Sequence, residues 1–131
     1  MILLAALASV GTLQGLAGER IGLLARFHTI RPRYEAIIAD IQAGKVPPGG
    51  HRYIIEKGIP LRVAFPWPGG ITDNWCGVVY DPSGLVLKAR IFKPDLSNFG
   101  DPTLQQVRLL FGGDLRSCEP LGGHWYYCCF T

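Results

Sequence analysis

The first 18 residues form the longest apolar run of the chain: none of them is charged, and most are Leu, Ala, Ile or Val. Apolar residues continue at helical spacing through Ile21, Leu24 and Phe27. The pattern predicts an apolar helix over residues 1–27, followed by a collar of basic residues. Because a membrane-spanning helix needs about 20 apolar residues, we expect this segment to be a single-pass membrane anchor.

Two other interpretations of residues 1–27 stay open. Gly15 and Ala17 have the spacing of a signal-peptide cleavage site, although no Lys or Arg precedes the apolar run as in such peptides. Alternatively, the protein is soluble and the segment is an amphipathic helix packed on its domain. The basic collar favours a cytoplasmic domain, whereas paired cysteines would favour a periplasmic or otherwise exported one. The two arguments predict opposite sides of the membrane.

A second helix is predicted over residues 32–43. Pro32 suits the first turn of a helix, and Gly44 suits the position just past its end. Apolar residues recur on one side at i, i+3, i+4 and i+7: Tyr34, Ile37, Ile38 and Ile41. We expect this amphipathic helix to lay its isoleucine side on a sheet.

The remainder of the chain has the short apolar runs and turn signals of β-structure. Two short strands are predicted, over residues 52–55 and 61–65. The strongest turn signal is Asp81 to Gly84, because a type I turn favours Asp first, Pro second and Gly fourth. It predicts a hairpin of strands 74–80 and 85–91, with Cys76 and Val78 on a core side and Val86 on a wet side.

A short helix over residues 101–111 and a second hairpin over residues 115–130 complete the prediction. The expected fold class is therefore α+β. The N-terminal apolar helix of residues 1–27 is followed by a domain of residues 32–131, in which the amphipathic helix packs on a small antiparallel sheet built from hairpins.

Charge and composition exclude some function classes. The net charge is +3 and the pI is about 8.8, but the basic residues are scattered. We expect no nucleic-acid partner, because such proteins cluster positive charge against phosphates. No phosphate-binding or dinucleotide-binding glycine motif occurs, so we expect no cofactor. Four possible zinc ligands lie near the C-terminus, but without the usual paired spacing, so we expect no metal: Cys118, His124, Cys128 and Cys129.

The four cysteines allow one disulfide to be predicted if the domain is exported. A loop at Gly122–His124 would place Cys118 opposite Cys128, within disulfide reach in favourable geometry. Cys76 is expected to be a small buried hydrophobe, so that its replacement by Ala would cost about 1 kcal/mol.

The enzyme alternative is a thiol-dependent hydrolase. It would pair a cysteine with His51 or His124 as base and with Asp73 or Asp81 as orienting carboxylate. Residues 81–86 resemble the nucleophile motif of the NlpC/P60 cell-wall peptidases over six positions. Pro82 stands where that motif has its cysteine, so the resemblance implies no activity here. We assign no catalytic residue.

Aromatic residues suggest a contact surface, because Trp and Tyr are favoured at interfaces. We therefore expect a small, bacterial-type, membrane-anchored protein with a non-catalytic interaction domain, which binds a protein partner or a second copy of itself. The candidate binding residues are Trp67, Trp75, His124, Trp125 and Tyr127.

Overall fold

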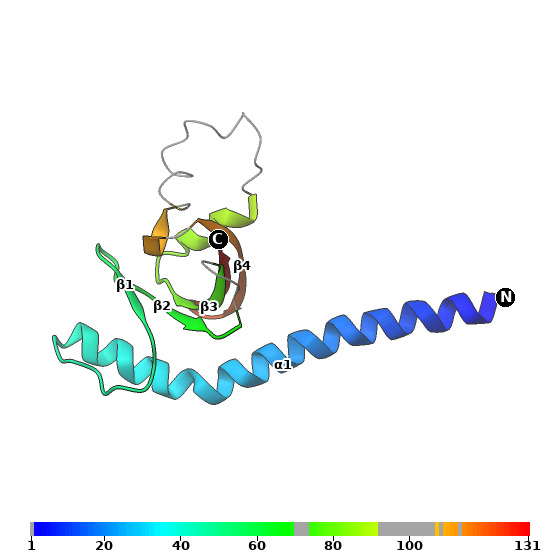
Figure 1. Cartoon of the computed structure of the whole chain (residues 1–131), viewed down its shortest axis with the longest axis horizontal. Coiled ribbons are helices and arrows are strands. Elements are labelled where there is room, and N and C mark those ends of the chain that lie inside the picture. The colour runs from blue at the N-terminus through cyan, green and yellow to red at the C-terminus, as the bar shows by residue number, and fades with distance from the viewer. Residues whose placement is uncertain (1, 70–73, 92–106, 108, 113) are drawn as a thin grey trace.

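The computed structural model describes residues 2–69, 74–91, 107, 109–112 and 114–131, with their side chains except those of residues 2–17 and 89–91. In this part of the chain one helix packs with a five-stranded antiparallel sheet, so the predicted α+β class is confirmed. The C-terminal half of α1 (Ile2–Gln42) lies beside the sheet, and its N-terminal half extends past it (Figure 1). Among the described residues, no helix combines the length and apolar character of a membrane span.

Helix α1 is continuous, so the expected break between two helices at Pro32 is wrong. A proline inside a helix costs about 3 kcal/mol, because its missing amide and its ring disturb the preceding turn. Phe27 before Pro32 and Ile37 after it are both buried in the same core cluster against the sheet. Packing on both sides of the proline keeps the two segments on one axis, as tertiary contacts commonly override local preference.

The end of α1 follows its sequence signal. The amide of Gly44 donates to the carbonyl of Ile41 at 3.1 Å, and the amide of Lys45 donates to the carbonyl of Asp40 at 2.8 Å. Gly44 has a φ of 71°, a left-handed conformation that glycine adopts without strain. These hydrogen bonds provide donors for carbonyl groups of the last helical turn, and the helix ends here.

The sheet has the order β1-β2-β3-β5-β4, and every neighbouring pair is antiparallel. The bounds are β1 Ile54–Glu56, β2 Arg62–Trp67, β3 Trp75–Tyr80, β4 Leu115–Gly122 and β5 Trp125–Phe130. Helix α1 covers one side, where Phe65, Val78 and Trp125 are buried. The opposite side buries Val79, Tyr126 and Phe130 with the 3₁₀-helices η1 (Leu85–Ile91) and η3 (Leu110–Gly112).

The predicted hairpin of strands 74–80 and 85–91 is wrong, because Leu85–Ile91 is the 3₁₀-helix η1. Strand β3 already has β2 on one edge and β5 on the other, so no edge is left for a third partner. The carboxylate of Asp81 accepts the amides of Ser83 and Val86, at 3.0 and 3.1 Å, and thereby starts the 3₁₀ turn. Val86, expected on a wet side, is fully buried.

Asp81 also forms a buried ion pair. The Nε atom of Arg62 donates to its carboxylate at 3.1 Å, and the Asp81 side chain has no exposed surface. The Nη2 atom of Arg62 donates to the hydroxyl of Ser83 at 3.0 Å. These hydrogen bonds join the start of β2 to the turn after β3. They also offset the free-energy cost of burying the charged carboxylate of Asp81.

The last hairpin is confirmed, with β4 and β5 joined by a turn at residues 123–124. The strands expected over residues 52–55 and 61–65 exist as β1 and β2, with bounds shifted by one or two residues. Most of the helix expected over residues 101–111 lies outside the described residues, and its described end belongs to η3.

Gly77 lies where β2 and β3 approach closely. A Cβ atom on Gly77 would overlap the carbonyl oxygen of Phe65 and would lie 2.8 Å from the Cα atom of Pro66. Pro66 is directly opposite Gly77 in the register, in a part of β2 that β1 does not pair with. A proline is tolerated there because its missing amide interrupts no pairing with β1.

Both neighbours of β5 are linked to it by disulfides. Cys118 and Cys128 lie opposite each other across the last turn and are joined, with their Cα atoms 4.1 Å apart. Cys76 is joined to Cys129, also with a Cα separation of 4.1 Å. Cys76 is therefore not an isolated buried hydrophobe, and it pairs with β5 instead of with the expected strand over residues 85–91. Because adjacent residues of a strand point to opposite sides, the two disulfides lie on opposite sides of the sheet.

Replacing both Cys76 and Cys129 with Ala is expected to lower the free energy of unfolding by about 4 kcal/mol, because the bond restricts the unfolded chain over 53 residues. Both residues are half-buried, so little packing is lost with them. Denaturant titration of the wild-type and double-variant proteins measures the difference. Reductant should destabilise the wild type more than the variant, and a loss of only about 1 kcal/mol would contradict the linkage.

Candidate functional site

Of the five residues predicted to form a contact surface, Trp67, Trp75 and Tyr127 line one hollow, whereas His124 and Trp125 lie elsewhere. Trp67 and Tyr127 are neighbours on the α1 side of the sheet, with ring centroids 5.5 Å apart. Trp75 stacks on Phe130 on the opposite side, at 4.1 Å. His124 is exposed in the β4–β5 turn, at the far end of β5 from Phe130.

Trp125 is not a surface residue, so its inclusion in a binding surface is wrong. Only 3% of it is exposed, and its ring packs against Phe27 at 5.6 Å and Tyr80 at 5.1 Å. Helix α1 covers it, and this could not be read from the local alternation of aromatic residues in β5.

The residues of the predicted thiol hydrolase are not assembled either. All four cysteines are in disulfides, so none offers a thiolate. The carboxylate of Asp81 is occupied by Arg62 and by the turn that follows it. Asp73 lies outside the described residues. Within the described part of the chain, no group of three or more His, Cys, Asp or Glu residues is arranged to hold a metal ion.

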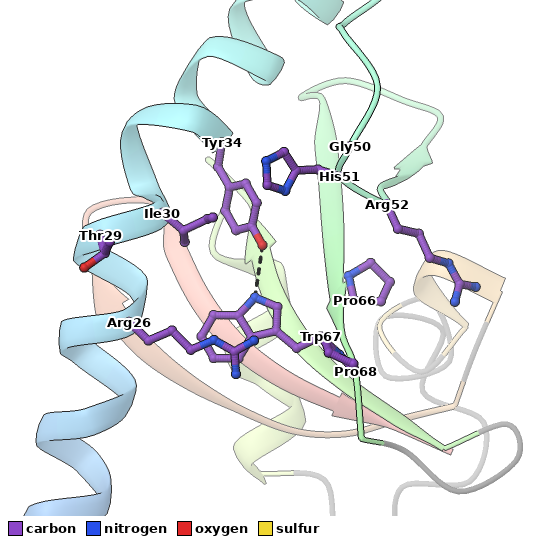
Figure 2. Close-up of a pocket in the computed structure, with 10 residues that line it drawn as sticks. All are labelled: Arg26, Thr29, Ile30, Tyr34, Gly50, His51, Arg52, Pro66, Trp67 and Pro68. Carbon is purple, nitrogen blue, oxygen red and sulfur yellow. Dashed lines mark hydrogen bonds between the residues drawn. The ribbon is translucent and has the colours of Figure 1, made fainter.

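A hollow lies between α1, the segment at residues 50–52 and the end of β2, as Figure 2 shows. Its volume is about 650 Å³. The described lining residues are apolar or positively ionisable, with two hydroxyl groups, and include neither Asp nor Glu: Arg26, Thr29, Ile30, Tyr34, Gly50, His51, Arg52, Pro66, Trp67 and Pro68. We call this space the first hollow.

A stacked guanidinium forms one wall of the first hollow. The Cζ atom of Arg26 lies 3.8 Å from the centroid of the Trp67 ring, in cation–π contact. The indole Nε1 of Trp67 donates to the hydroxyl of Tyr34 at 3.0 Å (Figure 2). Tyr34 itself stacks on Phe65 at 3.9 Å and meets the His51 ring edge-on at 5.9 Å. Each aromatic ring thus holds the next in place, from the core of the sheet to Arg26.

Burial raises the pKa of Tyr34, whereas the hydrogen bond from Trp67 and the positive charge of Arg26 lower it. Burial has the largest effect, so the Tyr34 hydroxyl is neutral at physiological pH. It can therefore accept the indole hydrogen bond and still donate its own proton.

A second hollow of about 420 Å³ adjoins the first. The two share Arg26, Trp67 and Pro68, so the stacked pair of Arg26 and Trp67 lies between them. The second hollow extends across the ends of β3 and β5, where Arg116, Tyr127 and the half-buried Cys76–Cys129 disulfide line it. Its described lining residues likewise include no Asp or Glu.

Two arginines at the first hollow have no carboxylate partner among the described residues. Arg26 and Arg52 are both exposed, and neither forms an ion pair with the described residues. Two guanidinium groups therefore border one hollow without a carboxylate partner. Such an arrangement attracts anions, because guanidinium groups bind carboxylate, sulfonate and phosphate in bidentate geometry.

Comparisons with protein-family models, with curated proteins and with solved structures find no match for this chain. The site is therefore interpreted from its own geometry.

The sequence analysis missed Arg26, Tyr34 and Arg52 as site residues. One signal could have found the first two: Arg26, Ile30 and Tyr34 are four residues apart and so lie on one side of the helix. An arginine on the side that also carries the core tyrosine is unusual for a purely structural helix. Arg52 has no comparable signal, because the path of residues 45–53 places it.

Replacing Arg26 with Ala is expected to raise the pKa of Tyr34 further, because the positive charge that favours tyrosinate is removed. An NMR pH titration of protein carrying ¹³Cζ-labelled tyrosine measures this pKa. Replacing Arg33, which is exposed on the same helix, with Ala should leave it unchanged.

The same titration has a stability consequence. Since the folded pKa of Tyr34 is raised above the unfolded value of about 10, its contribution to stability is complete below pH 10 and is lost as pH rises through the folded pKa. If the pKa of Tyr34 were the same in the wild type and in the Arg26→Ala variant, the electrostatic effect of Arg26 on Tyr34 would be contradicted.

Proposed function

We propose that this protein is a non-catalytic binding domain, attached to a membrane by its N-terminal segment and facing an oxidising compartment. Its ligand-binding site is the first hollow, and its ligand carries an anionic group beside a flat apolar part. One observation carries the proposal: the Arg26 guanidinium stacked on Trp67, beside a second guanidinium at Arg52 that has no ion-pair partner among the described residues.

The chemistry of the hollow supports an anionic ligand. A guanidinium stacked on an indole keeps its N–H groups free in the plane of the stack, where they can meet an oxyanion. The hydrogen bond from Trp67 to Tyr34 fixes the indole before any ligand arrives, which lowers the ordering cost of binding. Ile30 and Pro66 supply apolar walls for the remainder of the ligand.

The compartment is supported by the cysteines. Disulfides form and persist in oxidising compartments, and all four cysteines are paired. The basic residues after the apolar run favour the opposite side of a membrane. We give the disulfides more weight, because two bonds each require an oxidant whereas a positive collar is only a statistical tendency.

The membrane attachment is supported by the sequence of the N-terminal segment. Its first 18 residues carry no charge, and α1 extends past the sheet in this region (Figure 1). We do not propose the thiol-dependent hydrolase, since no cysteine is free to act as nucleophile.

Naphthalene-2-sulfonate is a suitable probe of the first hollow, because it joins a flat apolar ring system to one anion. We expect it to bind and to shift the indole N–H resonance of Trp67. Arg26→Ala should weaken binding about tenfold, which corresponds to about 1.4 kcal/mol. The matched control is Arg33→Ala, which removes the same charge from an exposed position of α1 and should bind the probe normally. Equal binding of uncharged naphthalene-2-sulfonamide, or no binding, would overturn the site.

Fractionation without detergent tests the attachment, with maleimide labelling before and after reduction. We expect the full chain in the membrane fraction, with its cysteines unlabelled until they are reduced. Val10→Arg should release the chain, because a charge inside an apolar membrane segment costs about 2.5–3.5 kcal/mol. Ala36→Arg, at an exposed position of α1, should not release it. A wild-type chain in the soluble fraction, or thiols labelled without reductant, would overturn this part of the proposal.

A further inference from the structure

The two hollows form one band across the molecule. They share Arg26, Trp67 and Pro68, so a ligand leaving the first hollow passes directly over the stacked pair into the second. The band begins at His51 and Arg52 and ends at Arg116, beside the ends of β3 and β5. A ligand that contacts both hollows therefore reaches residues that a small molecule held in the first hollow does not touch.

Positive charge recurs along this band. Arg52 lies at one end, Arg26 at the shared wall and Arg116 at the other end. The Nε atom of Arg116 donates to the hydroxyl of Thr131 at 2.9 Å, and its Nη2 atom lies 3.7 Å from the carboxylate of Asp114. Its side chain is nevertheless 57% exposed, and such surface pairs contribute little. It therefore stays available to an anionic partner. Among the residues that the structure describes, no Asp or Glu lines either hollow.

The walls between the charges are aromatic residues and prolines. Pro66, Trp67 and Pro68 are consecutive, and Tyr127 continues the wall into the second hollow. Grooves lined by aromatic residues suit extended peptide chains, whose side chains alternate between pockets and solvent. Three separated guanidinium groups match carboxylates spaced along such a chain.

We propose that the band binds an extended acidic peptide segment of a partner protein, with carboxylates at the three arginines and the backbone crossing the Arg26–Trp67 pair. This inference rests on the proposed function and names the ligand class of the same site. A nucleic acid is the less favoured partner, because phosphate binding relies on denser positive charge than three guanidinium groups and a net charge of +3.

The test uses the full chain in detergent micelles and a fluorescein-labelled octapeptide of alternating glutamate and alanine. Eight extended residues span about 26 Å. We expect saturable binding by fluorescence anisotropy, and at least tenfold weaker binding of the peptide with glutamine in place of glutamate. An eight-nucleotide oligothymidylate is the competing polyanion, and equal or tighter binding of it would overturn the peptide assignment.

Variants of Arg116 and Arg26, with Arg33→Ala as control, separate the peptide proposal from the proposed function. Arg116→Ala should weaken peptide binding about fivefold but leave naphthalene-2-sulfonate binding unchanged, because only the peptide reaches the second hollow. Arg26→Ala should weaken both ligands, and Arg26→Lys should recover part of the loss because the charge returns without the flat stack. Arg33→Ala should change neither.

The outcomes are distinguishable. If the sulfonate binds through Arg26 but the acidic peptide does not bind, or if Arg116→Ala leaves peptide binding unchanged, the peptide class is wrong and the binding domain stands. If neither ligand responds to Arg26→Ala while circular dichroism shows a folded protein, both proposals fail.

Discussion

The stacking of Tyr34 on Phe65 connects the helix to the sheet and positions everything that the candidate site contains. The two rings lie nearly parallel, 3.9 Å apart and at 12°, and Trp125 packs beside them. Because Tyr34 belongs to α1 and Phe65 to β2, this contact sets where the helix lies on the sheet. Arg26 is two helical turns before Tyr34, so the same contact brings its guanidinium over Trp67.

The centre of the sheet is stabilised by constraints of a different kind. Strands β3 and β5 carry the Cys76–Cys129 disulfide on the α1 side, and β4 and β5 carry the Cys118–Cys128 disulfide on the other side. Gly77 allows β2 to approach β3 more closely than a side chain would permit. The small domain therefore relies on cross-links and a close backbone approach in addition to its apolar core, as small domains commonly do.

The site differs from the interior in its treatment of charge. The buried carboxylate of Asp81 is satisfied by Arg62 and by the turn amides, so this ion pair is structural. Arg26 and Arg52 border a hollow with no such partner among the described residues. An exposed cation costs little in water, but two of them beside aromatic walls favour the binding of an anion whose desolvation they can offset. In the described part of the chain, the buried carboxylate of Asp81 is therefore paired with a cation, whereas the two arginines at the first hollow have no ion-pair partner.

The features that depend on residues close together in the chain could be predicted from the sequence. The helical side with Ile37 and Ile38, the helix end at Gly44, the turn after Asp81 and the last hairpin all follow from periodicity or turn chemistry within a few residues. The pairing of β3 with β5 could be seen only in the tertiary structure, because it joins residues about 50 apart and no local pattern encodes it. For the same reason, three other features could not be predicted from the sequence. They are the disulfide partner of Cys76, the continuity of α1 through Pro32 and the contact of Arg26 with Trp67. Each of them depends on how the helix and the five strands share one core.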